Sequence, residues 1–365
     1  MRRFLLAFLL ALLFLYSFGV CAFAQELSVP ITENDVPENA AEYLPKELFT
    51  ADANGFLELF TVKNVLKTVV SMLKGVFPDA MRAFFRFLGL MIISSVMSAL
   101  RKSVASQSFG AFLEYVSVLC VAAASFSFID GLFAEFETFI KQVSTFMLAI
   151  IPTMSALMLS SGEVSSSLVF GAVLSGVTSL LEFLCASAVI PMLKALLCVY
   201  TSANICVAGD LSYFAKLIKN TVTYTLTTIT VIMTCVLTFQ SVIAKSADTA
   251  AVKGVKFVLG NTVPIVGGAL ADAVGTVASS LGMVKSATGI LGAVVICALF
   301  AAPVIKLMVW KTVFDAAGAV GSALSLKKER DFFAGMGEIT SFMAALVSSV
   351  AVFFIIALAA AAFGG

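Results

Sequence analysis

Runs of about 20 consecutive apolar residues recur along this chain, and they limit the folds open to it more than any other feature. Residues 286–310 and 339–363 are two such runs. A helix of that length crosses the hydrocarbon core of a bilayer with its backbone polar groups paired. Of the 365 residues, 60% are hydrophobic and only 12% are charged, against about 25% charged in soluble domains. The sequence therefore predicts an all-α, polytopic membrane protein.

The N-terminus has the features of a cleavable signal peptide. Two arginines precede an apolar stretch, residues 4–20, and Ala22-Phe23-Ala24 is a small-x-small cleavage site. Cleavage there would make Gln25 the first residue of the mature chain. The alternative is that the stretch stays attached as an additional transmembrane helix.

Three regions are expected along the chain. They are the signal peptide at 1–24, an extracytoplasmic segment at 25–80 and a polytopic transmembrane domain at 81–365. Within the second region, residues 55–76 place apolar side chains at helical spacing opposite several lysines, which predicts an amphipathic helix. This helix either lies in the headgroup layer with its lysines toward anionic lipid, or packs on the outer surface of the protein.

About seven or eight spans are expected after the signal peptide. The apolar runs that predict them are 84–100, 111–129, 143–160, two within 164–209, 221–244, 286–310 and 339–363. The acidic stretch 130–141 is predicted to be an outer loop between two of these spans. Basic residues place the 101–110 loop, the 210–220 loop and residues 327–330 in the cytoplasm under the positive-inside rule.

Residues 257–284 are apolar but contain Pro264 and a single charged residue, Asp272. Asp272 divides the segment into 15 and 12 residues, each short for a full crossing. Pro264 removes a backbone donor, and Asn261 and the Gly267-Gly268 pair can relax the interrupted backbone. We therefore predict a re-entrant hairpin at 257–284, which also keeps the later basic loop inside. Asp272 remains open as an interfacial helix cap, a coupling-ion or proton site, or a structural or pore-lining acid.

Glycines recur every seven residues in the same region, at Gly268, Gly275, Gly282 and Gly289. On a helix they form a seam of small residues that lets another backbone approach closely. Because each glycine weakens a helix by about 1 kcal/mol relative to alanine, close packing is the use that best explains them.

Several kinds of chemistry have no support in the sequence. The chain contains no histidine, which removes the most common general base and transition-metal ligand. Its seven cysteines include no C-x-x-C pair, so neither a zinc site nor a disulfide framework is predicted. A phosphate-binding G-x-x-x-x-G-K-[ST] loop, an intramembrane-protease motif and a basic stripe for nucleic acid are all lacking. We therefore predict no catalytic site, metal, cofactor or nucleic-acid partner.

The segment KSADTAAVKGVKFVLGNTVPIVGGALADAVGTV, residues 245–277, resembles the signature region of the stage III sporulation protein AE family. The residues that carry the resemblance are Lys256, Phe257, Asn261, Pro264, Val266, Gly267, Gly268, Asp272 and Ala273. The signal peptide, the acidic outer segment and the later spans fit the same family. Family members often have a second acid where this chain has Gly275, and this departure argues against a mechanism based on two carboxylates.

The resemblance implies a mother-cell membrane protein of an endospore-forming bacterium. It would belong to the channel complex that joins the mother cell to the forespore during engulfment. The implied partners are the lipid bilayer, other proteins of the stage III sporulation operon including a secretion-type ATPase, and indirectly stage II sporulation protein Q from the forespore. The resemblance also allows a homo-oligomer.

Two functions compete at this point. The leading one is a non-enzymatic integral subunit of that channel complex, and the alternative is a self-sufficient secondary transporter with its substrate site at the interrupted 257–284 segment. The sequence shows no convincing internal repeat, which argues against the transporter. The residues predicted to have a family-motif, structural or pore-lining role are Lys256, Phe257, Asn261, Pro264, Gly267, Gly268, Asp272, Gly275, Gly282 and Gly289.

Overall fold

The computed structural model describes residues 62–103, 107–205, 213–236, 238 and 267–363, so the predicted signal peptide at 1–24 lies outside the described residues. The described ranges are helical except for short turns at 161–163 and 324–326, and the prediction of an all-α chain is confirmed for them. The helices are α4 (Val62–Ser103), α5 (Gln107–Ser160), α6 (Val164–Leu184), α7 (Ile190–Ile205), α9 (Gly267–Ala323), α10 (Lys327–Phe363) and a further helix at 213–236.

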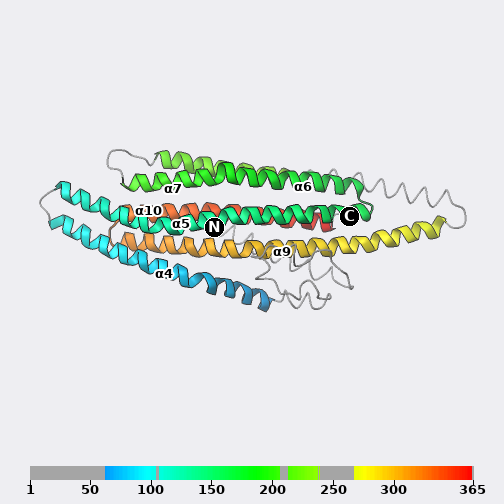
Figure 1. Ribbon diagram of the computed structural model, residues 1–365, viewed down its shortest axis with the longest axis horizontal. Helices are drawn as coiled ribbons and strands as arrows, with labels where there is room; N and C mark the ends of the chain where they lie inside the picture. Colours follow the sequence, from blue (N-terminus) through cyan, green and yellow to red (C-terminus); the bar gives the residue numbers. More distant parts are fainter. Residues whose placement is uncertain (1–61, 104–106, 206–212, 237, 239–266, 364–365) are drawn as a thin grey trace.

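The helices lie side by side along the long axis of the molecule (Figure 1). Helices α4, α7 and α9 end, and α5 and α10 begin, at the same end of the bundle, on the left in Figure 1. The basic stretches at 101–102 and 327–330 therefore lie at one common end. This arrangement agrees with the positive-inside rule, which predicts that both basic stretches lie on the cytoplasmic side of the membrane.

Five helical segments among the described residues are long and apolar enough to cross a membrane. They are Val69–Leu100, Tyr115–Ser160, Val164–Asn204, Leu291–Ala323 and Lys327–Ala362. Helix α5 has 54 residues and α9 has 57, so each is about 80–85 Å long at about 1.5 Å per residue. Because the hydrocarbon core of a bilayer is only about 30 Å thick, these two helices extend well beyond it.

The prediction of an outer loop at 130–141 is wrong. These residues lie inside α5, which runs without interruption between the two spans predicted on either side. The stretch contains no proline, and two of its acids find partners on neighbouring helices: Glu135 pairs with Lys306, and Glu137 pairs with Lys194. Because these carboxylates are paired along the helix surface, the chain does not need to leave the helix to accommodate them.

The two spans predicted within 164–209 also form one helical stretch, from Val164 to Ile205 in the described part. Helix α6 continues through a π-helical turn, Cys185–Val189, into α7. Across this turn the N–H of Ile190 donates to the carbonyl oxygen of Cys185, immediately before Pro191, which has no N–H to donate. The π turn therefore accommodates the proline within a continuous helix. The described residues contain five segments long and apolar enough to cross a membrane, against the seven or eight spans expected for the whole chain.

The re-entrant hairpin predicted at 257–284 does not occur in the described part of that segment. Residues 257–266 lie outside the described residues, but from Gly267 the chain is a single helix that passes Asp272 and continues to Ala323. No proline occurs between Gly267 and Pro303, and glycine is well tolerated in membrane helices. One carboxylate does not reverse a helix that has no breaker, so the described part of 257–284 is not a hairpin.

The predicted amphipathic helix at 55–76 corresponds, from Val62 onward, to the first part of α4, and residues 55–61 lie outside the described residues. Helix α4 continues through Pro78 into the first predicted span. The expected boundary at residue 80 between an outer segment and a transmembrane domain therefore falls within one helix.

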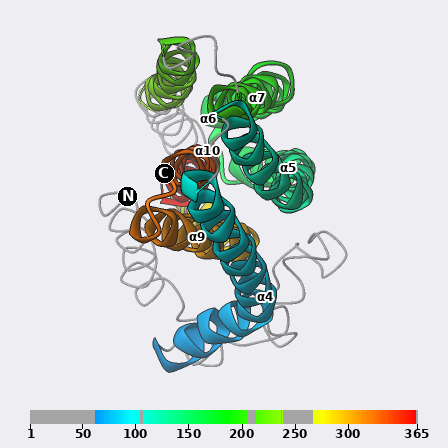
Figure 2. The same cartoon turned by 90° about the vertical axis from the view of Figure 1, so that its left-hand side faces the viewer.

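An aromatic cluster joins α4 and α5 to α9 and α10. Figure 2 shows α10 between α9 and the helices α5 to α7, and α10 is the most buried of the five apolar segments. Phe87 of α4 lies against Phe314 of α9 and Phe333 of α10, with ring centroids 6.2 and 5.1 Å apart. Phe128 of α5 approaches Phe87 to 5.6 Å. Four helices thus share one cluster, which fixes the α4–α5 pair against α9 and α10.

A continuous α5 predicts a labelling pattern that two spans and a loop do not. Cysteines introduced at Ser103 and Ser161, in a chain that lacks its seven native cysteines, should react with a membrane-impermeant maleimide from opposite faces of the membrane. The reason is that a helix of about 80 Å cannot return to the face on which it started. Two spans would bring both positions to one face, so labelling of both from the same side would contradict the continuous helix.

Candidate functional site

The structure describes the surroundings of only one predicted site residue. Lys256, Phe257, Asn261 and Pro264 lie outside the described residues. The positions on α9 where the structure describes the helical backbone but not the side-chain surroundings are Gly267, Gly268, Asp272, Gly275 and Gly282. Gly289 is the predicted residue whose packing can be stated.

Gly289 lies where α9 closely approaches α10. A methyl group added to its Cα would stand 2.4 Å from Cβ of Ala362 and 3.3 Å from the carbonyl oxygen of Leu358. Farther along α9, a methyl group at Gly292 would stand 2.3 Å from Cδ1 of Ile150 on α5. The missing side chains let the helices come this close, so α9 is fixed against both neighbours at this level.

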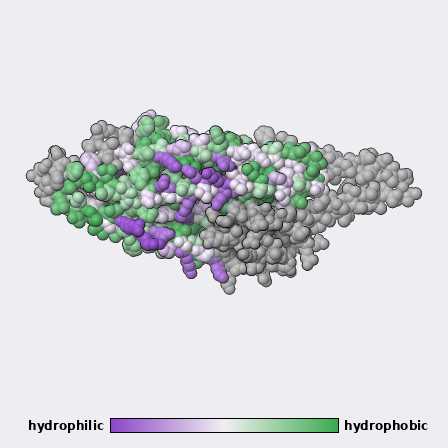
Figure 3. All heavy atoms as spheres, viewed as in Figure 1, coloured by the Kyte–Doolittle hydropathy of each residue, from purple (hydrophilic) through white to green (hydrophobic). Residues whose placement is uncertain are grey.

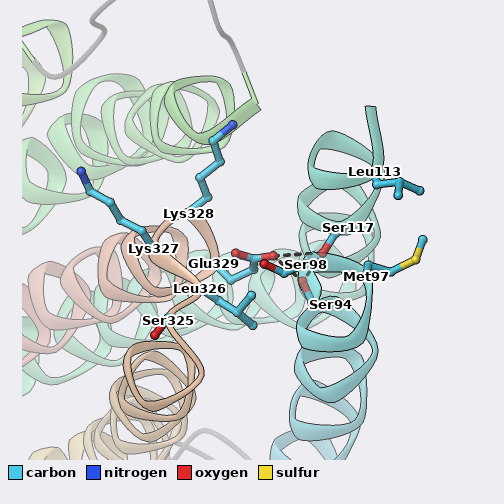
Figure 4. Close-up of a pocket in the computed structure, with 10 residues that line it drawn as sticks. All are labelled: Ser94, Met97, Ser98, Leu113, Ser117, Ser325, Leu326, Lys327, Lys328 and Glu329. Atoms are coloured by element: carbon cyan, nitrogen blue, oxygen red, sulfur yellow. Dashed lines mark hydrogen bonds between the residues drawn. The ribbon is translucent and has the colours of Figure 1, made fainter. Parts of the chain in front are cut away.

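A pocket with a buried carboxylate lies beside the turn between α9 and α10 (Figure 4). Glu329 of α10 is only 4% exposed, and its side chain points toward α4 and α5. The hydroxyl of Ser117 on α5 donates to Oε1 of Glu329 at 3.0 Å, and the hydroxyl of Ser94 on α4 donates to the same atom. The two serine hydroxyls also contact each other. Three helices therefore converge on one carboxylate oxygen.

The turn between α9 and α10 explains how Glu329 reaches this position. Ser325 is in the left-handed region with φ of 59°, and the N–H of Leu326 donates to the carbonyl oxygen of Gly321 at 2.8 Å, which closes the end of α9. Helix α10 begins at the next residue, so Glu329 lies in its first turn. The positive end of the helix dipole favours a carboxylate there.

The basic residues beside Glu329 contact other groups. Nζ of Lys328 lies 4.4 Å from the ring centroid of Tyr115, which is a cation–π contact. The guanidinium group of Arg330 donates to Asp331 at 2.7 and 2.9 Å. Within the described ranges no Lys or Arg nitrogen forms an ion pair with Glu329. Serine hydroxyls are therefore its polar partners in this part of the chain.

A second polar region consists of ion pairs between helices. We name the pairs Glu135–Lys306, Glu137–Lys194 and Glu338–Lys219 the charged belt. Figure 3 shows hydrophilic side chains gathered near the middle of the visible face, with hydrophobic surface beside them. The paired side chains are partly exposed, so each pair contributes at most about 1 kcal/mol in water. Two of the pairs join α5 to α7 and to α9, and the third joins α10 to the helix at 213–236.

The chemistry of the pocket is set by its oxygen atoms. Besides the Glu329 carboxylate, the hydroxyl-bearing residues that line it are Ser94, Ser98, Ser117 and Ser325. Hard oxygen ligands of this kind suit small hard cations and water rather than soft transition metals. The ranges that the structure describes contain no cluster of three or more His, Cys, Asp or Glu side chains able to hold a metal ion.

Sequence reasoning missed Glu329 and its serine partners. Glu329 lies in the run KKERD, residues 327–331, which has the composition of a solvated loop. Ser94 gave a weak signal, because a serine within an apolar span usually donates a hydrogen bond to some partner. That partner is 235 positions away in the sequence, so no local pattern could identify it.

Comparison with known proteins places the chain in a family. The sequence profile described as Stage III sporulation protein AE (spore_III_AE) matches residues 45–365. The stage III sporulation protein AE of Bacillus subtilis (strain 168) is 26% identical over 171 residues, which are 46% of this chain and 42% of that protein. The aligned part thus spans less than half the length of this curated relative. No solved structure matches the chain. Because the profile covers most of the sequence and the helices are those of a membrane protein, the chain belongs to the stage III sporulation protein AE family.

Proposed function

We propose that this chain is an integral membrane subunit of the channel complex between mother cell and forespore, needed for endospore development and late forespore gene expression. The observation that carries the proposal is the family match over residues 45–365, in a chain whose described residues include five apolar helical segments long enough to cross a membrane. In this proposal the protein lies in the mother-cell membrane facing the forespore and catalyses no reaction of its own.

The shape of the bundle supports a role as a subunit that other proteins contact. Helices α5 and α9, at about 80–85 Å, exceed the bilayer core by about 50 Å and so provide surface outside it. The chain has no phosphate-binding loop, so the energy for transport would come from a partner. The partners proposed are a secretion-type ATPase and other stage III operon proteins, stage II sporulation protein Q through the complex, and further copies of this chain.

The alternative of a self-sufficient transporter has less support. It placed a substrate site at an interrupted helix within 257–284, as transporters often do. From Gly267 onward that segment is an unbroken part of α9. No interruption occurs from Gly267 onward, while Asn261 and Pro264 lie outside the described residues.

Deletion of the gene in its endospore-forming host should block development after engulfment and abolish a late forespore reporter, while early reporters stay active. Affinity purification of the tagged chain from sporulating cells should recover the secretion-type ATPase of the same operon. A deletion strain that forms spores at the normal frequency would contradict the proposal. Solute accumulation by vesicles that contain only this purified chain would favour the transporter instead.

A further inference from the structure

Neither the family nor the proposed channel role accounts for the pocket around Glu329. Its carboxylate is 4% exposed, and the hydroxyls of Ser94 and Ser117 both donate to Oε1. Hydroxyl donors from two other helices therefore converge on one oxygen of a buried carboxylate.

A buried anion is costly unless a positive charge lies beside it. In the part of the chain that the structure describes, no Lys or Arg nitrogen lies within ion-pair distance of Glu329. Lys327 and Lys328 line the same pocket, but Figure 4 shows their side chains leading away from the carboxylate, and Lys328 lies over the ring of Tyr115. The serine hydroxyls give Glu329 hydrogen bonds but no formal positive charge.

The pocket offers both room and ligands for a small cation. Its volume is about 120 Å³, which exceeds what a single water requires. The oxygens of Ser94 and Ser117 retain lone pairs even while their hydrogens are donated to Glu329. Ser98 also lines the pocket, so all three hydroxyls can act as ligands. An all-oxygen set suits a hard cation, and Ca²⁺ sites normally draw on several carboxylates or carbonyls. One formal negative charge matches a monovalent ion.

We propose that the Glu329 pocket binds a monovalent cation of the size of sodium, held by the Glu329 carboxylate and the hydroxyls of Ser94, Ser98 and Ser117. The ion supplies a positive charge next to the carboxylate, where no Lys or Arg nitrogen of the described ranges lies within ion-pair distance. It also joins α4, α5 and α10, because each of these helices contributes a ligand, and so stabilises the packing of the α4–α5 pair on the α9–α10 turn. The inference rests on the pocket and does not depend on the channel role.

Thermal unfolding of the purified full-length chain in detergent tests this site. The Tm should rise with added sodium chloride and then saturate, while choline chloride at the same ionic strength should give no such rise, because an ion that binds only the folded state stabilises it. Glu329→Gln should lose the sodium-dependent part of the rise. Glu182→Gln, at a partly exposed acid on α6, should keep it. An equal rise of the Tm with potassium chloride would show that the pocket does not prefer an ion of the size of sodium and would overturn the proposal.

A second variant covers the case in which Glu329→Gln does not fold. Ser117→Ala keeps the carboxylate but removes one ligand, and it should raise the sodium concentration needed for half of the Tm rise by several-fold. Binding of radioactive sodium to the purified protein should weaken in parallel. A Tm that is independent of sodium but rises on acidification would show that a proton neutralises Glu329 and would overturn the proposal. So would a sodium response that Glu329→Gln and Ser117→Ala leave unchanged.

Discussion

Replacing Phe87 with alanine should strongly destabilise the bundle. The ring is completely buried and lies between Phe128, Phe314 and Phe333, which belong to three other helices. Truncation of a buried phenylalanine costs about 3–5 kcal/mol in soluble proteins, partly for transfer from water and partly for the cavity. Lipid is as apolar as the protein interior, so in a membrane the packing loss dominates. We therefore expect about 2–3 kcal/mol, seen as a lower Tm in detergent and less folded protein in the membrane.

The control for Phe87→Ala is Phe85→Ala, two residues away on α4. Phe85 is 61% exposed, and its ring contact is with its neighbour Phe84 at 6.0 Å. Phe85→Ala leaves no cavity between helices, so its stability should stay within about 0.5 kcal/mol of the wild type. Equal losses of Tm in the two variants would mean that the cluster around Phe87 does not join α4 to α9 and α10.

The class of the fold could be predicted from the sequence, but the ends of the helices could not. Apolar run length is a local property, and it indicated a helical membrane protein directly. The loop at 130–141 was predicted because several acids interrupt an apolar stretch. Their partners Lys194 and Lys306 are 57 and 171 positions away from Glu137 and Glu135. Whether the helix continues therefore depends on tertiary ion pairs that no local pattern contains.

The glycine series and the Glu329 pocket also differ in how much of each the sequence indicated. The spacing of the glycine series could be read along the chain, although the partner of Gly289 could not. Glu329 had no readable signal, because its burial follows from the short α9–α10 turn and from serines contributed by α4 and α5. Asp272, the acid that the sequence singled out, lies within a continuous helix. The surroundings of its side chain lie outside what the structure describes, so the role of Asp272 stays a prediction.

Gly289→Leu should cause the largest loss of folded protein among single changes on α9. Overpacking costs about 1–3 kcal/mol and sometimes more. The upper end applies here, because the added side chain meets Cβ of Ala362 and the backbone of α10, neither of which can move to another rotamer. Gly176→Leu is the matched control, since Gly176 lies on an exposed part of α6 with nothing within 4 Å of an added methyl group. It should keep wild-type abundance in the membrane and a Tm at least as high, because leucine is the better helix former.

A double substitution tests whether the close approach of Gly289 to Ala362 causes the loss of stability. Gly289→Ala should be destabilising, and Ala362→Gly in the same chain should recover part of the loss, because it removes the atom that lies 2.4 Å from the added methyl group. Residues in contact show coupling of about 0.5–3 kcal/mol in such cycles, whereas distant residues are additive. The Tm values of the two single variants and the double variant in detergent supply the measurement. Strict additivity would show that α9 and α10 do not meet at these residues, and the loss in Gly289→Leu would then have to arise within α9 itself.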